Sequence, residues 1–475
     1  MTKSAPRGAV AVMWRPGAVA VSKMLSTKVS VLAPTFNRAW CLGRALESVL
    51  SQSWRNLEII VIDDGSDDHT PEVCAKLAGV RYLRQPRNAG KTAAINLGLA
   101  HATGEFVWVM DDDDIAPPDA LARLIAPMLD DADVGFSYGE MKQFIETADG
   151  EIIFAPATPP RPLDPRPLFV RLMEDCFITG QPCTLFRRSA LDAIVPIDEA
   201  VKVSVDYNIL LQVARRFRGA HVDAVVLWQR QHDGLRGPSA QRYRAHERAE
   251  RWREADNRLL SRLLPSLDAA EFIGASANTS LSGEDRRRAY FQKAAIAGRK
   301  DLWQEASDAI RSARAAAPHA PLSSQERFIL SQTLGSRYGI DSFLFSPAAQ
   351  KALEEAAGSD RLGAEIRTAI AKRLTYWAGQ YVRAGDVRRL MAALNALVAL
   401  ARAQAGELVL AALLGKAPFK NRLVVPRRPA GEPVHSSASA PDSAVLSPFA
   451  ATAKQARAGA LRPRLQPEPQ AAAKR

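Results

Sequence analysis

The pattern of apolar and polar residues, which limits the folds open to this chain, changes beyond residue 228. Over residues 29–228, short β-rich runs alternate with helical stretches. Apolar runs separated by helices predict a mostly parallel sheet covered by helices on both faces. Beyond about residue 240 the strand signal disappears, and Ala, Arg, Leu and Glu recur at helical spacing. We therefore expect an α/β domain followed by an all-α region.

The expected elements can be given by residue range. The predicted strands cover 29–36, 57–64, 80–83, 105–110 and 134–140, and the predicted helices lie around 40–52, 70–77, 91–101 and 117–129. In the helical part, residues 290–310 and 376–397 look alike, each with an aromatic start and an Ala-Gly step. They predict helical hairpins with Gly at a C-cap or, alternatively, a degenerate repeat of the tetratricopeptide kind.

The excess positive charge lies at the two ends of the chain. The formal net charge is +12, yet the residues before Val29 carry +5 and those from Lys416 onward carry +8, which leaves −1 for the body. A nearly neutral body argues against nucleic acid as the partner. Met24 could be the true start. The predicted parts are a flexible segment 1–28, an α/β domain 29–240, a helical domain 241–425 and a disordered basic tail 426–475.

Cysteine usage and hydropathy bear on the compartment. The four cysteines form no CxxC pair, so neither a zinc site nor a disulfide framework is indicated, and a reducing cytoplasm is the expected location. The most apolar long stretch, Met391 to Leu414, is interrupted by Asn, Arg, Gln and Glu. Such residues are costly in lipid, so this stretch predicts an amphipathic helix and no transmembrane span.

Carboxylates follow two of the predicted strands. Asp63 and Asp64 end the run at 57–64, and the acidic cluster 111–114 directly follows the run at 105–110. Ligands of a parallel sheet bind beyond the carboxyl ends of its strands. Neighbouring carboxylates repel one another, and a hard divalent cation held by oxygen ligands would relieve that repulsion. A solvated acidic turn is the alternative, but placement at a strand end favours a metal site.

Motifs in this order resemble those of the family 2 inverting glycosyltransferases over about residues 29–235. They are Ala33-Pro34-Thr35-Phe36-Asn37-Arg38, Ile62-Asp63-Asp64-Gly65-Ser66, Asn88-Ala89-Gly90-Lys91, Met110-Asp111-Asp112-Asp113-Asp114 and Thr184-Leu185-Phe186-Arg187-Arg188. The resemblance implies a GT-A fold, a nucleotide-sugar donor and a divalent cation, Mn²⁺ or Mg²⁺. The acidic cluster stands where the family has its DxD metal motif.

The resemblance also implies roles for single residues. The positions that match its nucleotide-sugar contacts are Thr35, Asn37, Asp63, Asp64, Lys91 and Asp111. Lys91 would contact a phosphate, with an exposed lysine at a helix start as an equal alternative. Asp111 and Asp113 match the DxD pair, and Asp113 is favoured as the direct metal ligand. His232 would contact the metal or a phosphate, with a surface histidine in a loop as the alternative.

Asp206 aligns with the general base of the same family. An acceptor hydroxyl is a poor nucleophile, so a carboxylate must take its proton as it attacks the anomeric carbon. The family usually has Glu directly before this aspartate, whereas this chain has Val205, and the difference bears on how the acceptor is positioned. The alternative is that Asp206 is an N-terminal helix acid favoured by the dipole, since residues 207–213 form an apolar helical stretch.

The predicted function is that of an inverting, metal-assisted glycosyltransferase of polysaccharide or glycoconjugate synthesis. Its donor would be a UDP-sugar above all, and its acceptor a saccharide, a lipid-linked molecule or a protein. A sugar nucleotidyltransferase is one alternative, although Thr35–Ala39 lacks the Gly-rich basic loop expected of it. A non-catalytic GT-A protein that serves as a binding module is another, and the intact acidic residues argue against it.

The basic tail suggests a role at a membrane surface. Clustered Lys and Arg are attracted to anionic lipid, and the amphipathic stretch Met391 to Leu414 could add apolar contact. These features predict a cytoplasmic protein with peripheral attachment to the inner membrane face. The alternative is a tail that aids solubility beside a helix that packs within the C-terminal domain.

Overall fold

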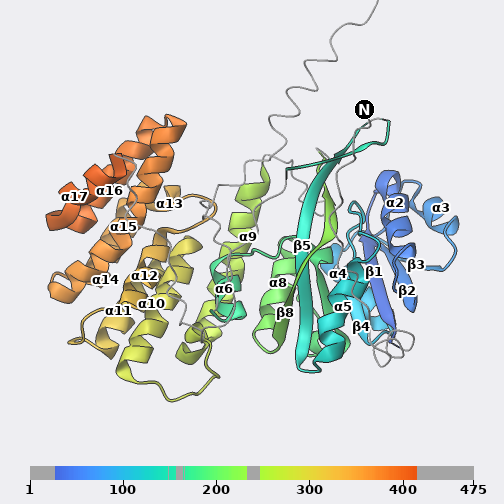
Figure 1. Ribbon diagram of the computed structural model, residues 1–475, viewed down its shortest axis with the longest axis horizontal. Coiled ribbons are helices and arrows are strands. Elements are labelled where there is room, and N and C mark those ends of the chain that lie inside the picture. The colour runs from blue at the N-terminus through green and yellow to red at the C-terminus, as the bar shows by residue number, and fades with distance from the viewer. Residues whose placement is uncertain (1–26, 148, 157–163, 165, 233–246, 414–475) are drawn as a thin grey trace, which may run out of the picture.

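The computed structural model describes residues 27–147, 149–156, 164, 166–232 and 247–413 of the 475-residue chain. Met24 and the predicted basic tail lie outside these residues, as does most of the predicted N-terminal segment. The sheet and the helical region occupy opposite ends of the long axis of the molecule (Figure 1). The order of the two regions along the chain is the one that the sequence pattern predicts.

One eight-stranded sheet organises the first region, in the order β3-β2-β1-β4-β7-β5-β6, with β8 beside β5. Neighbouring strands from β3 to β4 are parallel, β7 is antiparallel to both β4 and β5, and β5 is parallel to β8. The strands are β1 (Val29–Thr35), β2 (Leu57–Asp63), β3 (Val80–Arg84), β4 (Phe106–Val109), β5 (Val134–Glu146), β6 (Ile152–Phe154), β7 (Thr184–Arg187) and β8 (Arg218–Arg230). The predicted mostly parallel sheet is therefore confirmed.

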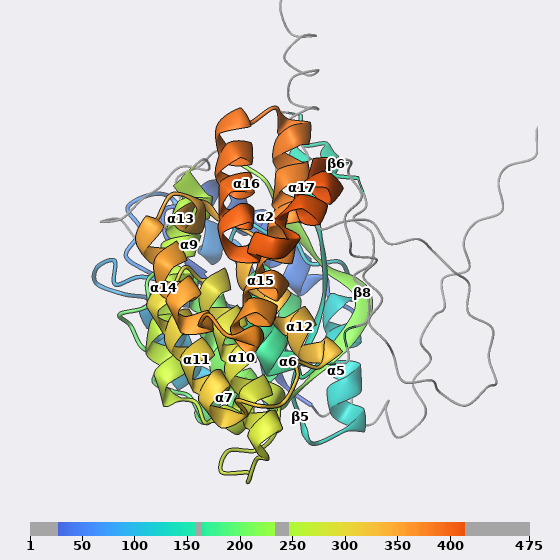
Figure 2. The same cartoon turned by 90° about the vertical axis from the view of Figure 1, so that its left-hand side faces the viewer.

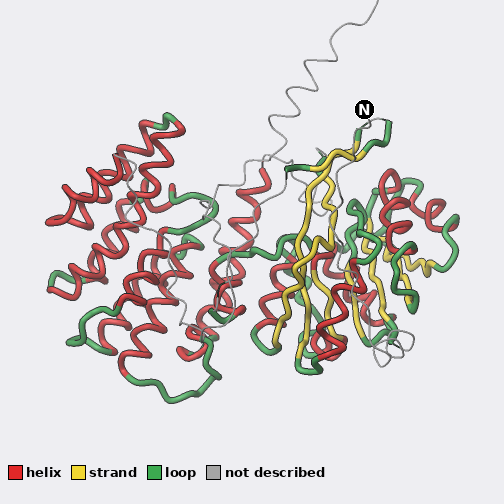
Figure 3. The backbone as a smooth tube through the Cα atoms, in the orientation of Figure 1, coloured by secondary structure: helices red, strands yellow, loops and turns green. Residues whose placement is uncertain are grey.

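Helices cover the sheet, as the alternation along the chain predicts (Figure 3). The helices of this region are α2 (Ala39–Leu50), α3 (Thr70–Ala75), α4 (Lys91–His101), α5 (Ala120–Asp130), α6 (Leu168–Glu174), α7 (Arg188–Asp192) and α8 (Val205–Ala214). Strands β1 and β4 are buried along their whole length. Burial of both faces explains why these strands read as continuous apolar runs.

Every described element from Arg248 onward is helical. These elements are α9 (Arg248–Leu263), η4 (Leu264–Ser266), η5 (Ala269–Ile273), α10 (Gly283–Arg299), α11 (Trp303–Ala316), α12 (Ser324–Ser331), η6 (Gln332–Leu334), α13 (Asp341–Leu344), α14 (Pro347–Ala357), α15 (Arg361–Ala384), α16 (Val387–Ala401), η7 (Arg402–Gln404) and α17 (Ala405–Leu413). The core of the sheet region continues into this part through Leu260, Phe272 and Ile296. A second core lies wholly among the helices. The boundary predicted at residue 240 stays a prediction.

Both segments expected to be hairpins are helix pairs, α10 with α11 and α15 with α16 (Figure 2). In the second pair Gly385 is the C-cap in the left-handed region, with φ of 67°, as predicted. In the first pair the prediction of a capping glycine is wrong. Gly298 lies inside α10, and Asp301 turns the chain with φ of 61°. A Cβ on Gly298 would lie 2.6 Å from the Thr333 carbonyl oxygen, so close helix packing requires glycine there.

Candidate active site

The carboxyl ends of β1, β2 and β4 lie at one edge of the sheet because these strands are parallel. Thr35 ends β1 directly beside Asp63, its partner at the end of β2. The acidic cluster 111–114 follows β4 at the same edge. The structure thus gathers the polar ends of three strands that are far apart in sequence. This edge is where ligands of such sheets bind.

Asp63 and Asp64 organise the loops around this edge. Asp63 is fully buried and accepts hydrogen bonds from the Ser66 amide at 2.7 Å and from the Tyr82 hydroxyl. The Asp64 carboxylate accepts from the amides of Ala89 and Gly90, at 2.7 and 2.8 Å. Burial raises the pKa of Asp64 above its ordinary value. Their expected contacts with base and ribose remain predictions.

Asn37 joins the loops that follow β1 and β2. Its backbone has φ of 55°, a region that Asn tolerates better than most residues. Its side-chain Oδ1 accepts a hydrogen bond from the backbone amide of Asp67 at 2.9 Å. The backbone amide of Asn37 donates to the Ser66 hydroxyl, also at 2.9 Å. Thr35 is buried just before it. Both residues therefore lie at the predicted nucleotide pocket, and their contact with a nucleotide stays a prediction.

Asp113 is the acid of the cluster that gathers most partners. Its Oδ2 lies 2.6 Å from Arg38 Nη1 and 3.0 Å from His232 Nε2. The sequence analysis places Asp113 and His232 among the metal contacts, and the structure brings these two side chains together from the segments that follow β4 and β8. Arg38 was missed as a site residue, although it ends the first motif beside Asn37. Its charge offsets part of the repulsion within the acidic cluster.

The remaining acids of the cluster have different surroundings. Asp114 is buried and accepts from the Arg230 amide at 2.9 Å, so it fastens the cluster to the end of β8. Asp112 lies 3.9 Å from Arg38 Nη1. Burial raises the pKa of Asp112 to about 6, against the attraction of Arg38. Asp114 therefore serves the fold, whereas ionisation of Asp112 costs free energy.

Lys91 connects the acidic cluster with Asp206. It is the first residue of α4, and its Nζ lies 2.5 Å from Asp111 Oδ1. Burial opposes its charge, but Asp111 and Asp206 together raise the pKa of Lys91 to about 12. Burial raises the pKa of Asp206, and Lys91 offsets part of that effect. The candidate base and the donor-side residues therefore share the field of one lysine.

Asp206 lies in the first turn of α8, and its Oδ1 accepts from the Tyr207 amide at 2.9 Å. This contact is what a helix N-terminal acid makes, so the alternative reading is also present in the structure. The two roles are compatible, because a carboxylate has two oxygens. A capping role alone does not explain why Asp206 lies within the electrostatic reach of Lys91 and Asp111.

The side chains at Asp113 suit a divalent cation. Asp113 Oδ2 and His232 Nε2 converge to 3.0 Å, and carboxylate with imidazole is a donor set that Mn²⁺ accepts. Among the described residues, no group of three His, Cys, Asp or Glu side chains could hold an ion alone. Catalytic Mg²⁺ or Mn²⁺ typically takes one or two carboxylates and completes its shell with substrate phosphates and water. The residues present fit such a partly open site.

Comparison with known proteins bears on this arrangement. Residues 30–195 match the model of Glycosyl transferase family 2. The chain is 35% identical over 115 residues to Glycosyltransferase GlyG of Streptococcus pneumoniae, which covers 23% of this chain and 38% of that protein. It is 37% identical over 116 residues to the GalNAc(5)-diNAcBac-PP-undecaprenol beta-1,3-glucosyltransferase of Campylobacter jejuni, which covers 23% of this chain and 36% of that protein.

A solved structure was also found, the mannosyltransferase PcManGT from Pyrobaculum calidifontis in complex with GDP-Man and Mn²⁺. It is 19% identical, and the match covers 73% of this chain and 87% of that chain with a TM-score of 0.40. A TM-score of this size carries no conclusion about this chain.

Residues 30–195 carry a family 2 glycosyltransferase domain, and the expected α/β domain followed by an all-α region is confirmed. The family match lies within the sheet region and ends before Asp206 and His232. The chain spans well under half the length of the two curated relatives that it matches. The family-model match does not include the helical region.

Proposed function

We propose that this chain is an inverting glycosyltransferase that moves a sugar from a nucleotide-diphosphate sugar, a UDP-sugar above all, to an acceptor hydroxyl. The family match over residues 30–195 supports glycosyl transfer. The observation that carries the proposal is the contact of Lys91 Nζ with Asp111 Oδ1 at 2.5 Å, since the charge of this lysine also acts on Asp206 in the first turn of α8. A candidate proton acceptor thus stands beside the residues proposed for the donor.

Asp206 acts as the general base in this proposal. Its carboxylate takes the proton of the acceptor hydroxyl while the hydroxyl oxygen bonds to the anomeric carbon. The bond from that carbon to the diphosphate oxygen breaks on the opposite side, and the nucleoside diphosphate leaves with the electron pair. Attack opposite the leaving group inverts the anomeric configuration. Because burial raises the pKa of Asp206, its carboxylate is a stronger base than an exposed aspartate.

The donor would be held at the carboxyl edge of the sheet. The residues assigned to the nucleoside part are Thr35, Asn37, Asp63 and Asp64, and Lys91 is assigned to a phosphate. Asp113 and His232 would hold Mn²⁺ or Mg²⁺ together with donor phosphates and water, with Asp111 as the further candidate ligand. A cation bound there would neutralise charge on the departing diphosphate. Arg38 contacts the same oxygen of Asp113 as His232 does, so it orients this carboxylate.

We place the acceptor among saccharides, lipid-linked molecules and proteins, in polysaccharide or glycoconjugate synthesis. The Campylobacter jejuni relative is named as a glucosyltransferase of an undecaprenol-linked saccharide, and this supports a lipid-linked acceptor. No helix within the described part of the chain is long and apolar enough to cross a membrane.

Peripheral binding to anionic lipid is part of the proposal. It is supported by the exposed apolar side chains Val387, Met391 and Val398 on α16 and by the basic residues after Lys416 in the sequence. Cosedimentation with anionic vesicles at low and high salt tests it, and salt-sensitive binding is expected. Binding that survives removal of the residues after Gly415 would exclude the tail as its cause.

The transfer proposal is tested with a panel of nucleotide sugars and Mn²⁺, by measuring release of the nucleoside diphosphate with and without candidate acceptors. We expect release with at least one donor, and NMR of the product should give the inverted anomeric configuration. A retained configuration would exclude the direct displacement. Pyrophosphate release from a nucleoside triphosphate and a sugar phosphate would instead identify a nucleotidyltransferase. Donor binding without release would identify a binding module.

A further inference from the structure

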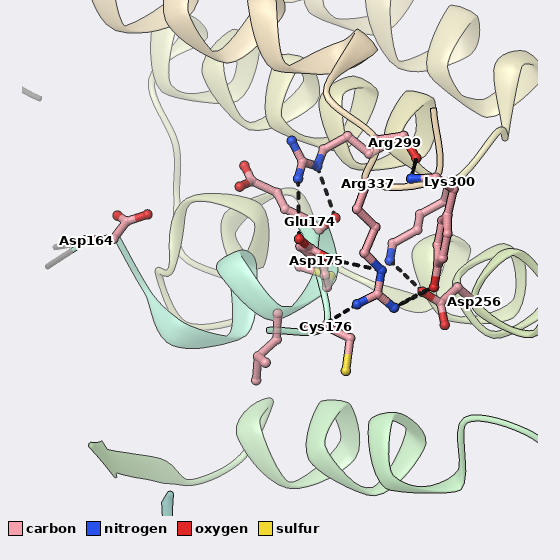
Figure 4. A network of polar contacts seen from close by, with 12 residues as sticks. Asp164, Glu174, Asp175, Cys176, Asp256, Arg299, Lys300 and Arg337 are labelled. Atoms are coloured by element: carbon pink, nitrogen blue, oxygen red, sulfur yellow. Dashed lines mark hydrogen bonds and ion pairs between the residues drawn. The ribbon is translucent and has the colours of Figure 1, made fainter. Parts of the chain in front are cut away.

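Figure 4 shows a buried charged network around Asp256, Lys300 and Arg337 of the helical region, and a hydrogen bond from Ser204 joins this network to the start of α8. At its centre is Asp256 of α9, which is 1% exposed. Its Oδ2 lies 3.1 Å from Lys300 Nζ, 3.1 Å from the Tyr338 hydroxyl and 3.4 Å from Arg337 Nη2. All three partners come from the helical region. They fix the Asp256 carboxylate in one orientation.

The other oxygen of Asp256 faces the sheet region. The Ser204 hydroxyl donates to Asp256 Oδ1 at 3.3 Å. Ser204 is the N-cap residue of α8 and has φ of 58° and ψ of 37°, a left-handed conformation that is uncommon for a residue other than Gly or Asn. Such conformations persist where surrounding contacts enforce them, and they cluster at functional sites. Asp206 follows two residues later.

Three further contacts hold the same turn and its neighbour in place. Lys300 Nζ lies 5.0 Å from the centre of the Tyr207 ring, and the Tyr207 hydroxyl donates to the Leu172 carbonyl at 2.6 Å. Arg337 Nη1 donates to the Cys176 carbonyl at 2.7 Å. The helical region therefore contacts both the first turn of α8 and the segment after α6 that packs beside it.

We propose that Asp256 is a positioning residue that fixes the first turn of α8, so that the helical region completes the active site of the GT-A domain. The inference rests on the proposed function of Asp206 as a general base. A displacement of about 1 Å in a catalytic group can lower a rate by roughly a hundredfold. An element that holds this turn in place is therefore part of the catalytic apparatus without contact with substrate.

Stability alone is a weak reason for this network. Burial of charges costs desolvation energy that their attraction repays only in part. The helical region has another buried ion pair, Arg287 with Glu326, whose side chains are 1% and 4% exposed. That pair joins α10 to α12 and stays within the helical region. The Asp256 network differs in its target, which is the turn that carries Asp206.

The test compares four variants in the full chain: Asp256→Asn, Ser204→Ala, Ser204→Asn and the control Glu326→Gln. Asp256→Asn and Ser204→Ala should lower kcat about tenfold with donor KM within about twofold of wild type. Ser204→Asn should restore most of the rate, because Asn tolerates left-handed backbone and its amide can donate to Asp256. Glu326→Gln should lower the melting temperature at least as much as Asp256→Asn and leave kcat unchanged.

Hydrogen exchange of the amides in residues 204–208 gives a readout independent of turnover. Asp256→Asn should speed exchange there about tenfold, and Glu326→Gln should not. If the wild type transfers no sugar but exchange responds as expected, the proposed function fails and the positioning role stands. If exchange in 204–208 is unchanged, or if kcat falls equally in Glu326→Gln, the positioning role is overturned.

Discussion

Half-buried carboxylates at the sheet edge and a buried carboxylate in the helical region behave in opposite ways. At the sheet edge, burial raises the pKa of Asp206 and raises that of Asp112 to about 6. In the helical region, burial works against Glu326 too, yet hydrogen bonds from Arg287 and Ser323 lower its pKa. Ionisation of Asp206 and Asp112 therefore destabilises the fold, whereas ionisation of Glu326 stabilises it.

The difference shows that carboxylates at the two places serve different purposes. Glu326 forms a capping box at the N-terminus of α12 and pairs with buried Arg287, so its hydrogen bonds serve the fold. Asp112, by contrast, carries its charge beside other acids in a site that protein groups only partly neutralise. Perturbed carboxylates of this kind cluster where function requires them. The comparison predicts opposite effects of mutation at the two places.

Asp113→Ala should produce the largest loss. It removes the carboxylate that contacts both His232 and Arg38, and metal-dependent transfer should fall by roughly a thousandfold or more, as expected for several kcal/mol of lost charge stabilisation. The fold should remain intact, because removal of one acid relieves repulsion in the cluster. Circular dichroism and donor turnover with added Mn²⁺ measure the two effects. Full turnover of this variant in a chelator would contradict the metal assignment.

Glu326→Gln should show the reverse pattern. Weakening a buried ion pair by removal of one charge should lower the free energy of unfolding by about 3 kcal/mol, while turnover stays at the wild-type value. Chemical denaturation measures the change. The matched control is Glu284→Gln in the exposed first turn of α10, which should change stability by less than about 0.5 kcal/mol. Equal effects of both variants would show that burial of the pair contributes little.

Glu58 lies on β2 in the sheet region but outside the candidate site. It tests whether the direction of a carboxylate's pKa shift depends on its role or on the region in which it lies. Burial opposes its ionisation, but hydrogen bonds from Ser30 and from the Thr103 amide lower the pKa of Glu58 from 4.5 to about 2. A lowered pKa stabilises the fold above the unfolded-state value, and this stability is lost as pH falls from about 4.5 to about 2. Acid denaturation of wild type should therefore be steeper in this window than that of Glu58→Gln. Identical pH profiles would contradict this assignment.

The sequence pattern predicted much of the fold, because long strands and helices carry their own periodicity. The five predicted strands are present, although β5 extends to Glu146. Strands β6 and β8 were missed, and β7 was identified only through a family motif. β6 and β7 have three and four residues, too few to form a pattern. The antiparallel insertion of β7 between β4 and β5 depends on long-range pairing that no local signal encodes.

The candidate site was predictable where family motifs follow strand ends. The structure brings Asp113 to His232 and Lys91 to Asp111, and the roles of these residues toward donor and metal stay predictions. The sequence did not reveal that Asp63, Asp64 and Asn37 also hold the surrounding loops together. The link from Asp256 to Ser204 spans 52 positions between two regions. Contacts of this kind depend on how packed elements meet, which periodicity does not describe.

Asp206→Asn tests whether this carboxylate is kept ionised for catalysis at a cost in folding free energy. Because burial raises the pKa of Asp206, its ionised form destabilises the fold above the unfolded-state pKa, and this cost is absent at lower pH. At neutral pH the account predicts that kcat falls by roughly a hundredfold or more, with donor affinity unchanged and a melting temperature equal to or above that of wild type. A lower melting temperature with turnover retained would contradict it.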